Sequence, residues 1–478
     1  MTKSRIAKSD LTILVILLFG TFLSFLNQTL MNVALPSIMR DFDITAGQGQ
    51  WLSNGYMLIS GVMIPATAFL IDRFKTRHLY LVSMIVFTVG TLIASVSINY
   101  PMLIVGRMVQ ALGAGPISPL MTVVVMNMFP IENRGKAMGF IGLAMNFAPA
   151  IGPTLSGWIV QSYSWRSIFY IVLPLAVINL VVAFFALKNI GQQSFPKFNF
   201  TGILLSTVGL GTLLLGFSNA GDKSWLTFDV AGYILVGLVV TGLFIYQQSA
   251  TKIPMLNFAV FQSRLFTIST ITNFVVIMGL YGGMILLPIF LQNVQGVSPM
   301  TSGMVLLPGA LITAFMSPIT GALYDRMGAK YLSLGGLLIL AVGTFCFSFV
   351  QPATSLAYLA SMQGIRSFGL ALALMPLQTE ALNSLPLELI SHGSAMYNTI
   401  RQIAGSIGTA LLVTVMSVGT RNYLGANPTV SLDLATIHGI KIAYITAAVI
   451  TLIAAGLCLL LTTPKKAIKE SLSHLAEG

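Results

Sequence analysis

The sequence predicts an all-α integral membrane protein with fourteen transmembrane helices, arranged as two six-helix bundles with two extra helices between them. Composition is the first observation, because 55% of the 478 residues are hydrophobic and only 8% are charged, with a mean hydropathy of +0.87. So few charges could not cover the surface of a soluble protein of this size. The other two observations are a series of long apolar segments and an internal repeat. A soluble enzyme, a nucleic-acid-binding protein and a disordered chain are therefore excluded.

The apolar segments set the number of helices, since a transmembrane helix needs about 20 predominantly apolar residues. The first of them follows Lys3, Arg5 and Lys8 and so resembles a signal peptide. Its apolar core is too long, however, and no small-residue cleavage site follows, so we expect a retained helix. The fourteen segments are 11–35, 51–71, 79–98, 102–127, 137–160, 168–187, 201–219, 230–246, 265–291, 302–324, 332–350, 355–383, 395–418 and 442–463.

The basic residues predict the orientation. If the N-terminus is cytoplasmic, 17 of the 25 Lys and Arg residues fall on the inner side and 5 on the outer side. The remaining three, Arg107, Arg366 and Arg401, lie inside the apolar segments. Because cytoplasmic loops are enriched in Lys and Arg, we expect both termini in the cytoplasm and a multi-pass protein of the cell (inner) membrane.

An internal repeat explains the two bundles. Four short patterns of the first half recur in the same order in the second half, at offsets of 253 to 259 residues. The repeat relates each segment to the eighth one after it, so two extra helices must lie between two sets of six. The predicted division is 1–187 for the first bundle, 188–264 for the linker with the extra helices, 265–463 for the second bundle and 464–478 for a cytoplasmic tail. The paired patterns are Asp72-Arg73 with Asp325-Arg326, Arg107 with Arg366, Asn127-x-x-Pro130-x-Glu132 with Asn383-x-x-Pro386-x-Glu388, and Gly135-x-Ala137-Met138 with Gly393-x-Ala395-Met396.

Several motifs together resemble those of the fourteen-span drug:proton antiporters of the major facilitator superfamily, the EmrB/QacA type, and within it the lincomycin-resistance-type (LmrB-like) exporters. The resemblance covers nearly the whole chain. It implies the major facilitator fold and a multidrug efflux function, in which lipophilic small molecules are exported in exchange for protons by alternating access. The motifs are residues 25–36, 51–56, Arg107 to Gly115, Ala148 to Gly157, Leu287 to Pro299 and Arg401 to Gly408.

Two of these motifs predict moving parts. The fifth segment carries a smooth, kinked face that we interpret as a pivot sealing the cavity while the halves rock, with ordinary close packing as the alternative. The short links after the second and tenth segments carry charges that we interpret as a gating latch, with topology signals as the alternative. The pivot residues are Ala148, Pro149, Gly152, Pro153, Ser156 and Gly157, and the latch residues are Asp72, Arg73, Asp325 and Arg326.

Charged groups within the membrane are the candidates for proton coupling. Relatives carry an aspartate in the first segment, where this chain has Asn27, so Glu380 is the one carboxylate that falls in a predicted segment. Arg401 lies at similar depth and could pair with it. Arg107 and Arg366 could couple protons or simply bind backbone carbonyls, and Asp222 at the outer edge is the next acid to consider. With two arginines and no midplane acid, the sequence also predicts export of neutral or weakly charged lipophiles in preference to divalent cations.

Polar and aromatic residues in otherwise apolar segments are the candidates for a substrate cavity. A mostly apolar pocket with a few polar groups suits loose recognition of lipophilic molecules, and methionine adapts to several shapes. Interhelical packing is the alternative role for each of them. The candidates are Asn27, Met31, Asn146, Phe147, Asn273, Ile277, Met278, Tyr281, Tyr397 and Asn398.

The residues leave two other functions open: a dedicated exporter of a specific metabolite, lipid or amphipathic anion, and a membrane enzyme or sensor. The sequence has no G-x-x-x-x-G-K-[ST] phosphate loop, so ATP is not the direct energy source. It also has no pattern of metal ligands and no nucleophile motif. We therefore expect a protein that is not an enzyme, has no cofactor and no metal, and acts as a monomer on lipophilic small molecules and protons in the lipid bilayer, without nucleic acid.

Overall fold

The computed structural model describes residues 8–44, 46–190, 199–220, 224–251 and 254–461, and every regular element within these ranges is a helix. Each of the fourteen predicted segments corresponds to a long helix or, for the fourth segment, to two. The long helices are α1 (Lys8–Phe42), α2 (Ala46–Arg73), α3 (Thr76–Ser95), α4 (Tyr100–Ala114), α5 (Ile117–Met128), α6 (Arg134–Ser162), α7 (Ser167–Ala186), α8 (Phe200–Asn219), α9 (Tyr233–Ala250), α10 (Arg264–Ile289), α11 (Pro299–Met327), α12 (Ala329–Cys346), α13 (Leu356–Asn383), α14 (Ile390–Ala426) and α15 (Leu432–Cys458).

The fourth segment is divided between α4 and α5 at Gly115 and Pro116. Proline has no backbone N–H, so it fits the start of a helix but not its interior. A Cβ on Gly115 would lie 2.7 Å from Cβ of Met63, which shows how closely this break packs against α2.

Within the described residues, twelve helical stretches are long and apolar enough to cross a membrane. The stretches α4–α5 and α10 with the short helix after it each count once. Helices α6 and α13 are not among the twelve, although they contain 29 and 28 residues. Helix α13 contains the charged residues Arg366 and Glu380, and the side chains of Pro149, Ala150 and Pro153 on α6 lie outside the described part of the chain. The twelve stretches agree with the predicted membrane protein, and the total of fourteen spans stays a prediction.

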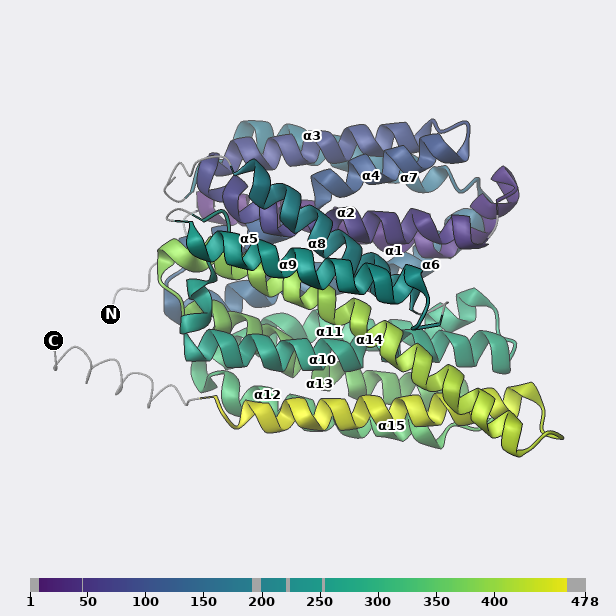
Figure 1. Ribbon diagram of the computed structural model, residues 1–478. Coiled ribbons are helices and arrows are strands. Elements are labelled where there is room, and N and C mark those ends of the chain that lie inside the picture. The colour runs from purple at the N-terminus through teal and green to yellow at the C-terminus, as the bar shows by residue number, and fades with distance from the viewer. Residues whose placement is uncertain (1–7, 45, 191–198, 221–223, 252–253, 462–478) are drawn as a thin grey trace.

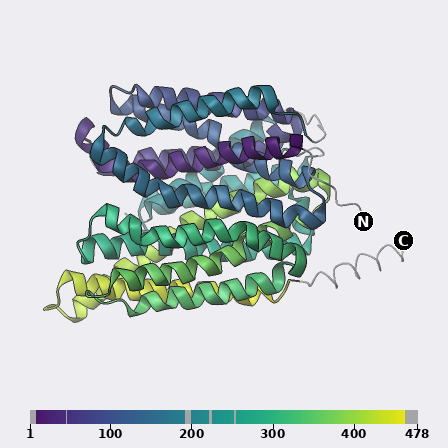
Figure 2. The same cartoon turned by 180° about the vertical axis from the view of Figure 1, so that it is seen from behind.

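The helices run side by side in one bundle with two parts (Figure 1). Helices α1 to α7 form one part and α10 to α15 the other, and the view from behind shows the same division (Figure 2). Two seams join the parts, one between α6 and α11 and one between α2 and α14. Helices α8 and α9 pack on each other, and α8 contacts both α2 and α14. The extra pair therefore lies over the α2–α14 seam.

The outward faces of the bundle are apolar. Phe185 on α7 and Leu238 on α9, for example, are 81% and 57% exposed. In water such side chains would be costly to expose, whereas lipid tails accept them. Many buried side chains are instead small or polar, which is typical of helices that pack against each other in a membrane.

The α6–α11 seam brings two backbones into contact. A Cβ on Gly139 would lie 2.5 Å from the carbonyl oxygen of Ser317 and 2.7 Å from Cα of Pro318. One turn earlier, a Cβ on Gly135 would lie 2.5 Å from the carbonyl oxygen of Gly321. Only residues without a side chain permit this approach, so the G-x-x-x-G spacing on α6 determines how closely the two parts meet.

Candidate substrate pocket and gate

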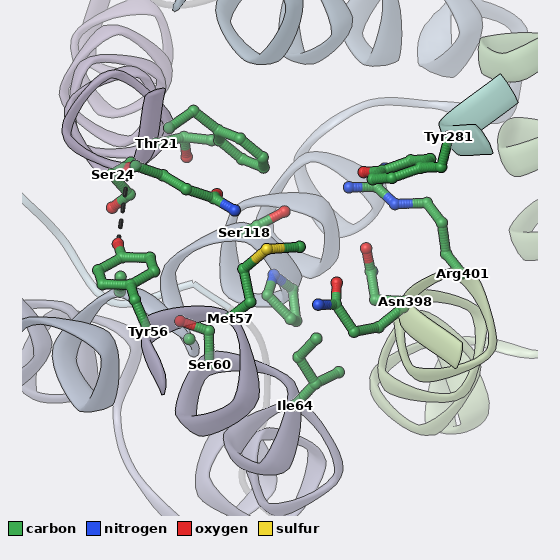
Figure 3. Close-up of a pocket in the computed structure, with 16 residues that line it drawn as sticks. Thr21, Ser24, Tyr56, Met57, Ser60, Ile64, Ser118, Tyr281, Asn398 and Arg401 are labelled. Atoms are coloured by element: carbon green, nitrogen blue, oxygen red, sulfur yellow. Dashed lines mark hydrogen bonds between the residues drawn. The ribbon is translucent and has the colours of Figure 1, made fainter. Parts of the chain in front are cut away.

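A pocket lies between the two parts of the bundle, with a cavity volume of about 90 Å³. Sites for drug-sized molecules enclose about 300–1,000 Å³, so in this conformation the pocket is smaller than a site that holds such a molecule. Figure 3 shows side chains from both parts converging on the space. The lining residues are Thr21, Ser24, Phe25 and Gln28 of α1, Tyr56, Met57, Ser60 and Ile64 of α2, Ala114 of α4, Gly115, Ser118 and Pro119 at the α4–α5 break and on α5, Tyr281 of α10, and Asn398, Arg401 and Gln402 of α14.

The wall formed by α1 and α2 offers hydroxyl groups and apolar surface. The Tyr56 hydroxyl donates to the carbonyl oxygen of Ser24 at 3.4 Å, as the dashed line in Figure 3 shows. The Ser60 hydroxyl donates to the carbonyl oxygen of Ala111 at 3.4 Å. Both contacts fix polar side chains without charge, so this wall recognises shape and hydrogen-bonding groups more than charge.

The opposite wall carries a cation. Among the described residues that line the pocket, Arg401 alone is charged, and Figure 3 shows its side chain extending beside Tyr281. Two glycines make room for this wall. A Cβ on Gly405 would lie 3.3 Å from the Tyr281 ring, and one on Gly61 of α2 would lie 3.2 Å from Cγ of Gln402.

Of the ten predicted cavity residues, the structure places Tyr281 and Asn398 on the pocket. Asn27 and Met31 are fully buried, because a neighbouring face of α1 turns toward the space. Asn273, Ile277 and Tyr397 are also buried in helix packing. The other three, Asn146, Phe147 and Met278, are absent from the lining as well. These eight residues lie outside the described lining of this pocket, and their role in a substrate cavity stays a prediction.

Three of these residues have evident packing roles. The Asn146 amide donates to the carbonyl oxygen of Gly142 at 2.7 Å, within its own helix. The Phe147 ring lies 6.3 Å from Phe22 and 6.1 Å from Phe315, so it fills the space between α1, α6 and α11. The backbone of Met278 lies against Gly408, where a Cβ would be 2.5 Å from its Cα.

The polar stripe on α1 that does line the pocket was missed. Thr21, Ser24 and Gln28 follow helical spacing, so the three side chains share one face. That spacing is visible in the sequence, but the prediction for α1 followed the family motif that begins at Phe25 and therefore named Asn27. Ser118 and Gln402 carried no comparable signal.

Arg107 and Arg366 lie outside the pocket, and both are bound within the protein. The Arg107 guanidinium donates to the carbonyl oxygen of Leu52 at 3.3 Å and to Gln110 at 3.0 Å. It also lies 4.3 Å from the centre of the Tyr56 ring, a cation–π distance. Arg366 donates to the carbonyl oxygen of Leu280 at 3.2 Å and to Gln363 at 3.4 Å. The substrate-charge argument from these two arginines is therefore wrong in its premise, since neither faces the cavity.

The two parts are fastened together at the end of the bundle where α1 begins and α15 ends, called here the α1/α15 end. The Asp325 carboxylate, at the end of α11, accepts hydrogen bonds from the backbone N–H groups of Gly135 at 2.8 Å and Lys136 at 2.9 Å. These groups belong to the first turn of α6. A carboxylate at a helix N-terminus satisfies free N–H groups and interacts favourably with the helix dipole. Asp325 is thus placed as a latch would be.

Asp72 of the first part makes the corresponding contact with the second part. At the end of α2, its carboxylate lies 3.3 Å from Nε2 of His392, in the first turn of α14. The backbone N–H of Asn257 donates to Nδ1 of the same histidine at 3.3 Å. A nitrogen that accepts a hydrogen bond carries no proton, so this geometry assigns a neutral His392 that donates from Nε2 to Asp72. Arg73 and Arg326, the other predicted latch residues, are exposed beside these contacts.

Glu380 belongs to this end of the bundle and not to the pocket. The Tyr324 hydroxyl donates to its carboxylate at 2.8 Å. The Asn383 amide donates to the same hydroxyl at 3.1 Å, and Arg134 of α6 donates to the Asn383 side-chain oxygen at 3.2 Å. The predicted pairing of Glu380 with Arg401 is therefore absent, because the two lie in different polar environments. Tyr324, Asn383 and Arg134 were missed, since no family motif joins them.

The predicted pivot face of α6 packs against α1 within the same part. A Cβ on Gly152 would lie 2.8 Å from Cβ of Thr29, and the Ser156 hydroxyl donates to the carbonyl oxygen of Leu30 at 2.6 Å. Ala148 and Gly157 are buried. The side chains of Pro149 and Pro153 and the whole of Asp222 lie outside the described residues. The pivot role stays a prediction.

A helical bundle with apolar outer faces, a pocket between two parts and charged contacts that close one end defines a membrane transport protein. The chain belongs to the Major Facilitator Superfamily, because the model of that family matches residues 17–409. Members of this family are transporters and not enzymes, so the expectation of a transporter is confirmed at that level.

Curated relatives agree. The chain is 44% identical over 455 residues to the uncharacterized MFS-type transporter YcnB of Bacillus subtilis, covering 95% of this chain and 96% of that one. It is 37% identical over 448 residues to the lincomycin resistance protein LmrB of the same bacterium, covering 92% and 93%. The human organic anion transporter MFSD10 has the same fold, with a TM-score of 0.66 at 14% identity over 94% and 99% of the two chains. The protein is thus a multi-span transporter, and its bacterial relatives imply the cell membrane.

Proposed function

We propose that this protein is a secondary active multidrug exporter that expels lipophilic small molecules in exchange for protons by alternating access. The observation that carries the proposal is the central pocket, lined from both parts of the bundle, together with the latches that close the bundle at one end. A site between two rocking halves is the arrangement that alternating access requires. The relatives named for lincomycin and multidrug resistance support the direction of transport.

We further propose fourteen spans of the EmrB/QacA type, with α6 and α13 crossing the membrane as well. At about 1.5 Å per residue, either helix is long enough for the bilayer core of about 30 Å. Both helices pack against α11, which is itself apolar enough to span. The division at 1–187, 188–264 and 265–463, with a tail at 464–478, accords with the two parts and the extra helix pair.

The α1/α15 end is proposed to face the cytoplasm, with both termini inside, on the strength of the Lys and Arg distribution. Asp72 and Asp325 then close the cytoplasmic side, and the described conformation is closed inward. Opening this side requires Asp325 to leave the N-terminus of α6 and Asp72 to leave His392 of α14. The protein is proposed to act as a monomer.

Proton coupling is proposed to involve Glu380. Its carboxylate shares a hydrogen-bonded chain with Tyr324, Asn383 and Arg134, and this chain crosses from one part of the bundle to the other. Adding a proton to Glu380 removes the charge that Tyr324 donates to, which weakens the chain where the halves meet. Proton entry therefore favours opening at this end.

The alternative within transport is a dedicated exporter of one metabolite, lipid or amphipathic anion. Arg401 is the single charged residue of the described lining, and a lone cation on the pocket supports this alternative. A membrane enzyme or sensor has no support from the pocket, whose described lining holds no carboxylate, histidine or cysteine.

Transport by purified protein in proteoliposomes tests the proposal. A pH gradient is imposed, and movement of cationic, neutral and anionic lipophiles is measured against protein-free vesicles. We expect several chemically different lipophiles to move against their gradients, with proton counterflow. Movement of a single compound would favour the dedicated exporter, and a gradient-independent leak would contradict antiport.

A further inference from the structure

Arg401 differs from the other two intramembrane arginines in its hydrogen bonds. Arg107 and Arg366 each donate to a backbone carbonyl and to a glutamine side chain. The Arg401 side chain donates to no other residue in the described part of the chain, and no described carboxylate forms an ion pair with it. A guanidinium has five N–H donors. On Arg401 these donors are left to whatever occupies the pocket.

The missing partner has a definite chemistry. A cation inside a membrane protein is costly unless something compensates it. A carboxylate does so best, because its two oxygens match the fork of the guanidinium and make two charge-assisted hydrogen bonds. A cationic ligand would meet only repulsion at this wall, since the described lining holds no acid.

The rest of the pocket indicates the shape of the ligand. Asn398 and Gln402 flank Arg401 on α14 and line the same pocket, and the Asn398 amide also donates to the carbonyl oxygen of Ser394 at 2.9 Å. Across the space, Phe25, Met57 and Ile64 provide apolar surface. Polar groups gathered around one cation and apolar groups opposite suit a molecule with one anionic end and one lipophilic body.

We propose that the pocket is a binding site for amphipathic organic anions, in which Arg401 holds a carboxylate headgroup and the α1–α2 wall holds the apolar body. This inference rests on the proposed function, because it names the substrate class of the same site. Low affinity for dications, which the sequence predicted from Arg107 and Arg366, is now expected because of Arg401.

The test uses three probes that share one apolar body: 1-naphthylacetate, its neutral N-methylamide, and (1-naphthylmethyl)trimethylammonium. Binding to the purified full-length protein is measured by titration calorimetry, and transport is measured in proteoliposomes. We expect the carboxylate to bind at least about tenfold more tightly than the ammonium probe.

The variants separate charge from packing. Arg401→Gln keeps an amide but removes the charge, and should lower affinity for the carboxylate about tenfold or more while affinity for the neutral amide changes less than about twofold. Arg401→Lys should retain part of the preference, because it keeps a cation but loses the fork. Arg421→Gln, an exposed position on the same helix, is the matched control and should change nothing.

The outcomes distinguish this inference from the proposed function. Equal binding of the three probes, tighter binding of the ammonium, or equal weakening of all three in Arg401→Gln would overturn the anion site. If Arg401→Gln does not fold, the preference of the unmodified protein among the probes decides. Arg401-dependent binding without any transport would instead leave the anion site standing and contradict the exporter.

Discussion

The charged side chains inside the helices of this protein have different surroundings, and these suggest different roles. Arg107 holds the Tyr56 ring at 4.3 Å and thereby shapes a pocket that it does not touch. Arg401 lines the pocket itself. Glu380 accepts a hydrogen bond from the Tyr324 hydroxyl and does not line the pocket. We therefore propose Arg107 as a positioning residue, Arg401 as a binding residue and Glu380 as the residue that takes the proton.

Glu380→Gln should weaken the pH dependence of transport while leaving the fold intact. The glutamine side-chain oxygen still accepts the hydrogen bond from Tyr324, so the local structure persists, but the group no longer titrates. Transport rate is measured from pH 5.5 to 8.5 with a fixed substrate gradient. Tyr324→Phe is the companion variant, because it removes the hydrogen bond and keeps the titrating group. A Glu380→Gln profile that coincides with that of the unmodified protein would make Glu380 structural.

Sequence reasoning located these residues unevenly. That Arg107, Arg366 and Glu380 lie inside long helices could be predicted, because a charge in an apolar segment is visible. Which way each side chain points could not, since rotating a helix by about 100° moves the neighbouring residue onto the same face. Asn27 and Gln28 show the effect, because the predicted residue is buried and its neighbour lines the pocket.

At the scale of the helices, the sequence predicted where each helix lies along the chain better than it predicted the residues at which the helix begins and ends. All fourteen segments overlap helices, but α1 extends to Phe42 and α14 from Ile390 to Ala426, well beyond the predicted 11–35 and 395–418. Hydropathy marks the apolar part of a helix, whereas its hydrogen bonds continue into polar residues. The seams between helices were not predicted, because close approach depends on which glycines face each other.

Gly139→Leu should block transport without preventing insertion. Its side chain would meet the backbone of Ser317 and Pro318 across the α6–α11 seam, where nothing can yield. The two parts would be held apart at the α1/α15 end, so substrate could no longer be released on the opposite side. Transport and membrane content are measured together. Gly242→Leu on α9 is the control, since nothing lies within 4 Å of a Cβ there.

Gly152→Leu should behave differently, although it lies on the same helix. Its side chain would meet Thr29 inside one part of the bundle. The expected result is lower thermal stability of the purified protein, by about 2 kcal/mol as for other overpacked sites, and reduced transport as a consequence. A variant of normal stability that fails to transport would support the pivot interpretation.

At the scale of the whole molecule, the two latches form a reciprocal pair. Asp325 of the second part contacts α6 of the first, and Asp72 of the first part contacts α14 of the second. The repeat in the sequence relates these two contacts to each other, so their existence was predictable. The involvement of His392 and Asn257 was not, because the repeat counterpart of His392, Arg134, is bound elsewhere.

Asp325→Asn should loosen the α1/α15 end. Losing the charge at a helix N-terminus costs up to about 1 kcal/mol, which corresponds to about a fivefold shift toward the open conformation. Hydrogen–deuterium exchange of the peptide that contains Gly135 and Lys136 measures this directly, and it should speed up about fivefold. Asp433→Asn, an exposed acid on α15, serves as the control. Unchanged exchange in Asp325→Asn would contradict the latch.

The reciprocal latches also carry information about assembly. Each part of the bundle supplies a carboxylate that is bound in the first turn of a helix of the other part, Asp325 by backbone N–H groups of α6 and Asp72 by the His392 side chain of α14. Two polypeptides made separately, residues 1–190 and 199–478, should therefore find one another in the membrane and copurify. Replacing both Asp72 and Asp325 with asparagine should weaken that pairing more than either replacement alone. The contacts that close the transporter would then be the same ones by which its two parts recognise each other.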